Sequence, residues 1–231
     1  MVLHWIIREH KKVLFFSLEL TREDVIEILI SKILQMPQYK VRQMIDTEEG
    51  KDIYEKVLDK LSKYLYVIDK NALSMDDIEE YIKIANNRIF DTDVDIVLVD
   101  YYQYLSGISD FQSDSLTARK MKKVAKENNI LFVMLSQFNK ESQSKDKGGK
   151  VSEPTMNMIK GAGDIGASAD AIILMWRPAT SMADGTIEYE ENKYITNMKI
   201  VKARKGLKLG KTHFKFKYSI DKNLLEEYNE E

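Results

Sequence analysis

Four short apolar runs, each set between helical patterns, constrain the fold of this chain more than any other feature. The runs are "VLFFSL" (13–18), "YLYVID" (64–69), "DIVLVD" (95–100) and "ILFVMLSQ" (130–137). They are mostly continuous rather than alternating, which is typical of strands buried on both faces of a sheet. Strands that alternate with helices predict an α/β fold, with a doubly wound, mainly parallel sheet and helices on both faces.

Two of the intervening helices carry clear start signals. Thr21 and Asp24 have the spacing of a capping box, and Pro37 stops the same helix. Ser74 and Asp77 open another helix in the same way. Further helical patterns cover residues 1–12, 38–45, 48–65 and 115–129.

The last third of the sequence has a different pattern. "AIILMW" (171–176) is expected to resume the sheet, and residues 193–206 and 211–220 are expected to form a closing antiparallel pair because they are rich in β-branched and aromatic residues. We treat residues 1–231 as one domain, 139–163 as a long polar loop region with a task of its own, and 221–231 as a frayed acidic tail.

Composition excludes several classes of protein. The formal charge of −2 arises from many charges of both signs, so any binding to nucleic acid must be local. The sequence has no cysteine and only three histidines, which leaves no disulfide framework and no usual zinc spacing. No apolar run approaches the roughly 20 residues that span a bilayer. These features favour a cytoplasmic protein without a membrane partner.

Polar side chains follow three of the predicted strands. They are Glu19, Asp100, and Ser136 with Gln137. Ligands of open α/β sheets bind beyond the carboxyl ends of the strands. In a nucleotide triphosphatase, one acid at this edge holds magnesium through its water shell and a second acid activates the attacking water. The alternative interpretation is that these residues only mark the ends of strands.

Five motifs resemble the C-terminal motor domain of DnaB-type replicative helicases, in a phage-like form. They are "FSLEL", "VDYYQYL", "LSQFNKE", "KGAGDIGASADAIILMWR" and "KARKGLKLG". Their order and separations carry the resemblance, which extends from about Val13 to Phe216. It implies a RecA-like core that forms a homo-oligomeric ring, a hexamer. It also implies hydrolysis of ATP or another NTP with Mg²⁺, translocation on single-stranded DNA, and primase and helicase-loader partners.

The resemblance also assigns roles to individual residues. Glu19 matches the catalytic glutamate that orients water, Asp100 matches the Walker B aspartate beside magnesium, and Gln137 matches the glutamine that links the γ-phosphate to the DNA loops. Lys202 and Arg204 match a basic pair that reaches the phosphates of a neighbouring subunit. Alternate residues of a strand share a face, so both can point into an interface. The alternative for this pair is a solvated basic edge strand.

"KGAG" falls where the family has a channel loop that grips the DNA backbone. Lys160, Gly161 and Gly163 would make these contacts through charge and through closely approaching main-chain amides. Family members commonly carry an arginine and a glutamate where this sequence has Lys160 and Gly161. A loop without a binding role is the alternative. The nearby tyrosines Tyr101, Tyr102 and Tyr104 are interpreted as core packing rather than as a base-stacking platform.

No G-x-x-x-x-G-K-[ST] phosphate loop occurs in the 231 residues. The family has that loop directly before the "FSLE" strand, so the resemblance leads us to expect a chain that begins just after the loop and is inactive alone. A truncated subunit that binds and regulates an intact helicase or DNA is the second hypothesis. Another RecA-like ATPase is the third, although "LSQFNKE" followed by "GAGDI" is not expected of it.

Overall fold

The described residues of the computed structural model fall into two compact units, Met1–Gln137 and Phe138–Glu231. The structure describes residues 1–105, 111–139, 153–159, 162–177, 179–181, 187–189, 194–204, 212–219 and 224–228.

A four-stranded sheet forms the centre of the first unit. Its order is β2 (Leu65–Ile68), β1 (Val13–Ser17), β3 (Ile96–Asp100) and β4 (Leu131–Met134). All three pairings are parallel. The four apolar runs of the sequence therefore form one parallel sheet, as predicted, with the fully buried β1 between two neighbours.

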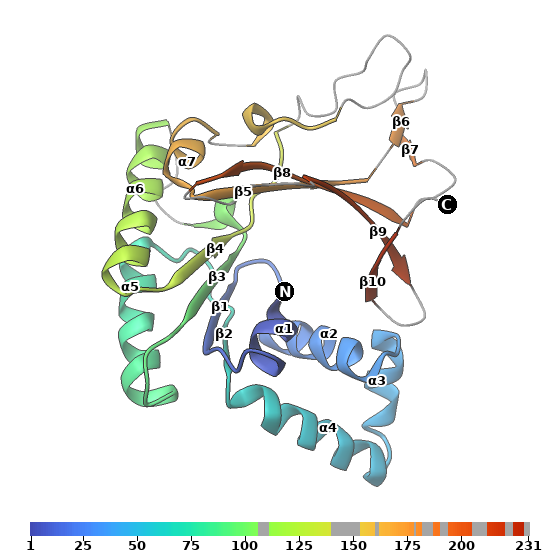
Figure 1. The fold of residues 1–231 in the computed structure, drawn as a ribbon. Coiled ribbons are helices and arrows are strands. Elements are labelled where there is room, and N and C mark those ends of the chain that lie inside the picture. The colour runs from blue at the N-terminus through green and yellow to red at the C-terminus, as the bar shows by residue number, and fades with distance from the viewer. Residues whose placement is uncertain are drawn as a thin grey trace. The chain divides into compact units, whose positions relative to one another are not determined.

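Helices cover both faces of this sheet (Figure 1). Val13 and Phe15 of β1 belong to a buried cluster that includes residues of the first four helices. Phe16 points to the opposite face, where its ring packs edge-on against Tyr81 with a centroid distance of 5.9 Å. The helices are α1 (Val2–Ile7), α2 (Arg22–Leu34), α3 (Gln38–Met44), α4 (Glu48–Ser62), α5 (Met75–Ile84) and α6 (Phe111–Glu127). The predicted doubly wound α/β arrangement is confirmed.

The predicted helix starts are also present. The Thr21 hydroxyl accepts a hydrogen bond from the backbone N–H of Asp24 at the start of α2. At the start of α5, the Ser74 hydroxyl accepts from the N–H of Asp77 at 3.2 Å, and the Asp77 carboxylate accepts from the N–H of Ser74 at 2.8 Å. Hydrogen bonds from Ser74 lower the pKa of Asp77.

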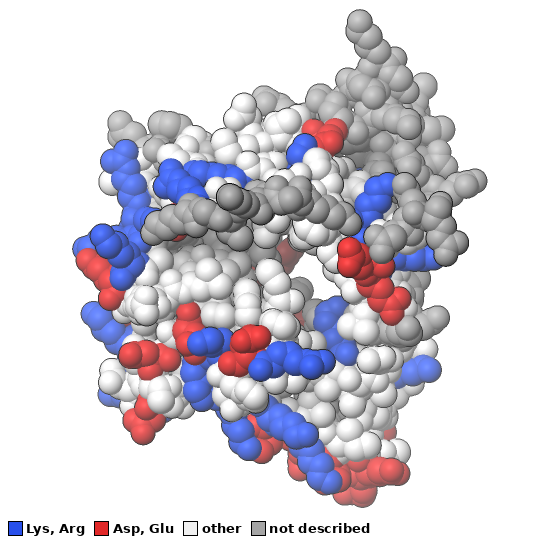
Figure 2. All heavy atoms as spheres, in the orientation of Figure 1, with Lys and Arg blue, Asp and Glu red and all other residues white. Residues whose placement is uncertain are grey.

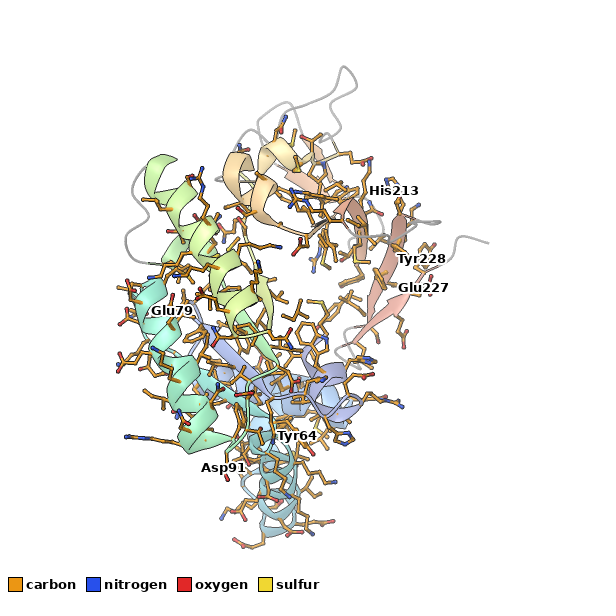
Figure 3. The ribbon with its side chains drawn as sticks, turned by 60° about the vertical axis from the view of Figure 1, so that its left-hand side comes forward. Tyr64, Glu79, Asp91, His213, Glu227 and Tyr228 are labelled. Atoms are coloured by element: carbon orange, nitrogen blue, oxygen red, sulfur yellow. The ribbon has the colours of Figure 1, made fainter. Side chains whose placement is uncertain are left out.

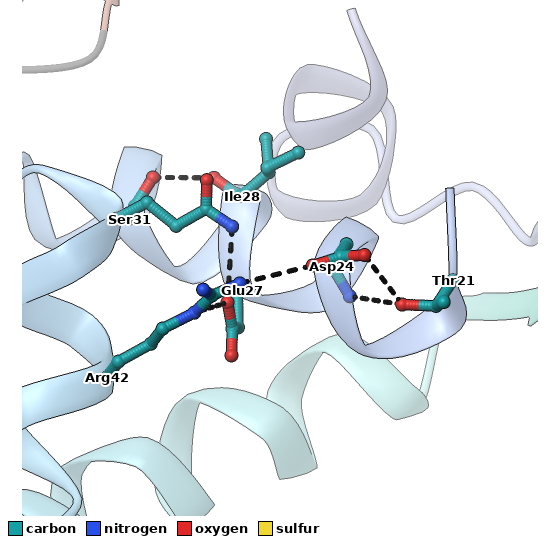
Figure 4. A network of polar contacts seen from close by, with 7 residues as sticks. Thr21, Asp24, Glu27, Ile28, Ser31 and Arg42 are labelled. Atoms are coloured by element: carbon teal, nitrogen blue, oxygen red, sulfur yellow. Dashed lines mark hydrogen bonds and ion pairs between the residues drawn. The ribbon is translucent and has the colours of Figure 1, made fainter. Parts of the chain in front are cut away.

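A polar network fastens α3 to α2 (Figure 4). Glu27 accepts hydrogen bonds from Arg42 Nε at 2.6 Å and from Gln38 Nε2 at 3.1 Å, and Arg42 also reaches Asp24 at 3.1 Å. Only 16% of the Glu27 side chain is exposed. A carboxylate at such a site must be paired, because an unpaired charge away from water is costly. The network thus compensates for the burial of Glu27.

A second ion-pair group joins α6 to α5, the helices on the opposite face. Lys120 pairs with Asp76, and its Nζ lies 3.8 Å from Glu79. Figure 3 labels Glu79 on α5. Lys120 therefore bridges the start of α5 to the middle of α6.

The second unit is built on an antiparallel sheet. Its order is β10 (Leu224–Glu227), β9 (His213–Ser219), β8 (Ile195–Ala203) and β5 (Ala171–Trp176). The predicted antiparallel pair is confirmed as β8 and β9. The unit also contains the helix α7 (Ala162–Ser168) and the two-stranded pair of β6 (Ala179–Ser181) and β7 (Ile187–Tyr189).

Two sequence expectations for this unit are wrong. "AIILMW" does not resume the parallel sheet, because β5 pairs antiparallel with β8. An apolar run specifies burial but not its pairing partner. Residues 224–227 do not fray, because β10 pairs with β9 and places Glu226 opposite Lys217. Figure 3 labels Glu227 and the neighbouring Tyr228 beside β9.

Charges of both signs are mixed on the surface. On the face drawn in Figure 2, many Lys and Arg side chains lie next to Asp and Glu side chains. This distribution agrees with the near-neutral composition. Within the described part of the chain, no helix combines the length and apolar character needed to cross a membrane.

Gly50 of α4 provides a test of the helical packing. A Cβ added at Gly50 would lie 1.8 Å from the carbonyl oxygen of Met44, whereas one added at Gly166 of α7 would lie 3.6 Å from the Met156 side chain. Helix propensity alone favours alanine over glycine by about 1 kcal/mol. We predict that Gly50→Ala lowers the free energy of unfolding and that Gly166→Ala does not, as measured by urea denaturation. Equal stabilisation by both changes would contradict the close approach at Gly50.

Candidate active site

The loop after β1 presents Glu19 at the carboxyl end of the parallel sheet. Ser17 is only 1% exposed, and its hydroxyl donates to the carbonyl oxygen of Leu20 at 2.8 Å. The N–H of Leu18 donates to the carbonyl oxygen of Asp100 at 2.7 Å, in line with the register of Ser17 opposite Asp100. Glu19 is exposed and lies between Leu18 and Leu20, whose backbone groups are held by these two hydrogen bonds. Its place at the sheet edge therefore follows from fixed backbone on either side.

Asp100 ends the neighbouring strand β3 and lies half-buried. Burial raises the pKa of its carboxyl group, and the negative charge of Glu19 raises it further. The structure thus brings Glu19 and Asp100 close enough to interact. Two carboxylates that repel each other at a partly desolvated edge favour a positively charged ligand.

The segment after β3 brings Gln137 to the same edge. The N–H of Tyr102 donates to the carbonyl oxygen of Leu135 at 2.9 Å, so the chains that follow β3 and β4 remain side by side. A hydrogen bond to Tyr104, partial burial and the charge of Glu19 raise the pKa of Tyr101 to about 12, while a hydrogen bond from Gln137 opposes the rise. Tyr101 therefore interacts with both Glu19 and Gln137, and the three predicted residues converge.

The tyrosines of this segment behave differently from one another. Tyr102 is 1% exposed, which confirms the core-packing interpretation for this residue. Tyr104 is 47% exposed, so that interpretation is wrong for Tyr104. Its ring instead contacts the ring of Tyr101 with a centroid distance of 4.4 Å. Exposure thus increases from Tyr102 to Tyr104 along this 3₁₀ helix, so only its first tyrosine belongs to the core.

Sequence reasoning missed Gln103, which lies in the same 3₁₀ helix. Its side chain donates to the Ser136 hydroxyl at 2.9 Å and contacts the backbone of Gln137. The only sequence signal was its presence inside "VDYYQYL". That motif does not show which segment the side chain meets, because its partners lie more than thirty positions later.

Lys202 and Arg204 lie in the second unit and contact the last turn of α7. Lys202 Nζ donates to the carbonyl oxygen of Gly166, and Arg204 Nη2 donates to that of Ala167 at 2.8 Å. Cations near a helix C-terminus are stabilised by the unsatisfied carbonyl groups and the helix dipole. Both side chains therefore reach the same end of α7, and their role at a subunit interface stays a prediction.

The DNA-contact prediction lies mostly outside the described residues. Lys160 and Gly161 are not among them. Gly163 is exposed near the start of α7. The proposed contacts of these residues stay a prediction.

The carboxylates at the sheet edge suit magnesium more than zinc. Within the described ranges, no group of three or more His, Cys, Asp or Glu side chains could hold a metal ion. Mg²⁺ is usually bound by one or two carboxylates together with water and substrate phosphates. Asp100, half-buried beside a second acid, fits that requirement.

A family model described as "DnaB-like helicase C terminal domain" matches residues 1–223. The chain is 27% identical over 228 residues to the replicative DNA helicase DnaB of Haemophilus influenzae, covering 94% of this chain and 46% of that protein. It is 26% identical over 179 residues to a probable plasmid replicative DNA helicase of Chlamydia muridarum, covering 76% and 38%. The chain thus spans less than half the length of these relatives.

Two solved structures share the fold. One is described as an ATPase domain, with a TM-score of 0.73, 20% identity, and coverage of 94% of this chain and 74% of that chain. The other is a DnaB-like replicative helicase described together with its interactions with primase, with a TM-score of 0.72, 21% identity, and coverage of 94% and 50%. Both confirm the RecA-like helicase ATPase fold.

The pKa of Asp100 leads to a prediction about stability. Because folding raises this pKa, the folded chain binds the proton more tightly than the unfolded chain. Stability therefore falls as pH rises from the ordinary carboxyl pKa, roughly 4, through the raised value. We predict that Asp100→Asn raises the melting temperature at pH 7 and that the gain shrinks toward pH 4. The exposed acid Asp46, changed to Asn, is the control. No gain at pH 7 beyond that of the control would contradict the prediction.

Proposed function

Because the chain belongs to the DnaB-like helicase C-terminal domain family, we propose that it is the motor domain of a ring-shaped replicative DNA helicase. The motor couples hydrolysis of ATP or another NTP to translocation on single-stranded DNA and to unwinding of the duplex. One observation carries the proposal: Glu19, Asp100 and Gln137 converge at the carboxyl edge of the parallel sheet, where α/β folds bind ligands.

Glu19 and Gln137 have separate tasks in this proposal. Glu19 is exposed, so its carboxylate can accept a hydrogen bond from a water molecule and orient that water for attack on the γ-phosphorus. The Gln137 side chain donates to a γ-phosphate oxygen, and its bond with Tyr101 gives way when phosphate binds. The loss of the γ-phosphate then changes the position of the segment that leads toward residues 139–163.

Asp100 would hold Mg²⁺ through the water shell of the ion, and the nearby Glu19 would keep the edge negative enough to attract it. When bound, Mg²⁺ neutralises charge on the phosphates.

Lys202 and Arg204 act across a subunit interface. They supply positive charge to the phosphates bound by a neighbouring subunit. To do so, they exchange the α7 carbonyl oxygens that they contact here for phosphate oxygens. Lys202 lies in β8 and Arg204 directly follows the strand, and both side chains contact carbonyl oxygens of α7, which supports joint action.

Single-stranded DNA, further copies of the chain and two other proteins are the expected partners. Lys160, Gly161 and Gly163 grip the phosphates of single-stranded DNA in the channel of a homohexamer. A helicase loader and primase are the expected protein partners, and a related helicase has been studied with primase. We place the protein in the cytoplasm, where replication of bacterial and phage DNA takes place.

The first test concerns hydrolysis. Alone, the 231-residue chain should hydrolyse almost no ATP, because its sequence has no phosphate loop to offset the desolvation of the phosphates. The chain joined to a phosphate loop of the family should hydrolyse ATP and respond to single-stranded DNA. Glu19→Gln should then reduce kcat by about 100-fold or more with little change in KM. The exposed Glu23, changed to Gln, is the matched control. Full activity of Glu19→Gln would contradict the assignment.

The second test asks whether Arg204 acts in trans. In the motor with the phosphate loop, Arg204→Ala should reduce kcat by roughly a thousandfold, as for other arginine fingers. Mixing Arg204→Ala subunits with Glu19→Gln subunits should create interfaces in which an intact Glu19 faces an intact Arg204, so the mixture should exceed either variant. Arg88→Ala, at an exposed position, is the control for loss of an arginine. If subunit exchange is verified by fluorescence and the mixture stays inactive, Arg204 does not act in trans.

A further inference from the structure

The side-chain amide of Gln103 contacts three polar groups that follow β4. Its Nε2 donates to Ser136 Oγ at 2.9 Å and to the carbonyl oxygen of Gln137 at 3.4 Å. Its Oε1 accepts from the backbone N–H of Gln137 at 3.4 Å. The side chain of Gln103 therefore contacts both the N–H and the carbonyl oxygen of Gln137.

This contact begins where the strand pairing ends. The register of β3 with β4 runs to Val99 opposite Met134, and the N–H of Leu135 donates to the carbonyl oxygen of Val99 at 3.0 Å. A glutamine amide offers the same donor and acceptor as a peptide group. Gln103 thus extends the pairing of β3 and β4 beyond the point at which their backbones diverge.

Gln103 itself stands on a fixed support. Its neighbour Tyr102 is almost fully buried, and Leu105 at the end of the turn is also buried. The N–H of Tyr102 donates to Leu135, and the N–H of Leu105 donates to the carbonyl oxygen of Tyr102 at 3.1 Å. A side chain on such a support can restrain its partner, because its own backbone is held on both sides.

The side chain of Gln137 is restrained from another direction. It bonds with Tyr101, which also senses the charge of Glu19. Gln103 thus restrains the backbone of Gln137, and Tyr101 restrains its side chain. Both residues lie in the short segment that follows Asp100. The carboxylates and Gln137 are therefore parts of one connected arrangement rather than three independent strand ends.

We propose that Gln103 is a positioning residue of the motor: its amide fixes the backbone of Gln137, so that the Gln137 side chain faces the γ-phosphate in register with Glu19 and Asp100. This inference rests on the proposed function of Gln137. Misplacement of a reacting or binding group by about 1 Å can reduce a rate by about 100-fold. Loss of the Gln103 amide therefore impairs hydrolysis even though Gln103 itself does not contact the nucleotide.

The contact itself is tested first in the 231-residue chain, without any nucleotide. Gln103→Met keeps the length of the side chain and removes both hydrogen-bonding groups. By NMR, exchange of the Gln137 amide hydrogen should accelerate about two- to tenfold, the value of one modest hydrogen bond. The amide of Leu98 in β3 should be unchanged. Gln43→Met, at an exposed position of α3, is the matched control. Unchanged exchange at Gln137 would overturn the inference.

The second measurement tests positioning in the motor with the phosphate loop. Gln137→Ala should reduce kcat by about 100-fold, as for loss of one preorganised donor. Gln103→Met should reduce kcat by about tenfold or more with KM for ATP unchanged. In the Gln137→Ala background, Gln103→Met should cause no further loss, because it acts only through Gln137.

The outcomes separate this inference from the proposed function. If Gln137→Ala leaves kcat unchanged, the role of Gln137 is wrong and the positioning role of Gln103 falls with it. If Gln137→Ala is impaired but Gln103→Met is not, only the positioning role is overturned. An equal loss from Gln103→Met in both backgrounds would also overturn it, since that result indicates a general structural effect.

Discussion

The parallel pairing of β1 with β3 is the interaction on which the rest of the site depends. It places Ser17 opposite Asp100 and ends in the hydrogen bond from Leu18 to the carbonyl oxygen of Asp100. The apolar residues of both strands are buried, so a shift of one residue would turn their side chains to the wrong faces of the sheet. The register that is required by the core therefore also sets the positions of the two acids.

The edge of the sheet is less favourable energetically than its centre. Asp100 is partly desolvated beside Glu19, and both effects raise its pKa. This arrangement is typical of a ligand-binding site, because such sites keep charged groups that lower the stability of the folded chain. The surrounding polar groups are well supported: Ser17 fixes the turn that contains Glu19, and Gln103 reaches the segment that carries Gln137. The proposed motor thus combines a rigid backbone with an excess of negative charge.

The sequence predicts what local pattern and strand order determine. Continuous apolar runs give the parallel strands, and the spacings of Thr21 with Asp24 and of Ser74 with Asp77 give the helix starts. Because polar residues end or follow these strands, the sequence also predicts that Glu19, Asp100 and Gln137 lie at the same edge of the sheet. Pairing over long distances was not predictable in the same way. Neither the antiparallel partner of β5 nor the contact of Gln103 with Ser136 follows from local composition. The contact of Arg204 with α7 likewise depends on tertiary structure.

The most direct test of this account is a cryo-EM structure of the motor with its phosphate loop, Mg²⁺ and a non-hydrolysable ATP analogue. We expect the γ-phosphate at the carboxyl edge of β1, β3 and β4, within roughly 3 Å of the Gln137 side chain and one water molecule from Glu19. We also expect Gln103 to contact the backbone of Gln137 in that complex. A nucleotide bound at another edge of the sheet, or a bound nucleotide from which Glu19 and Gln137 both point away, would contradict these expectations.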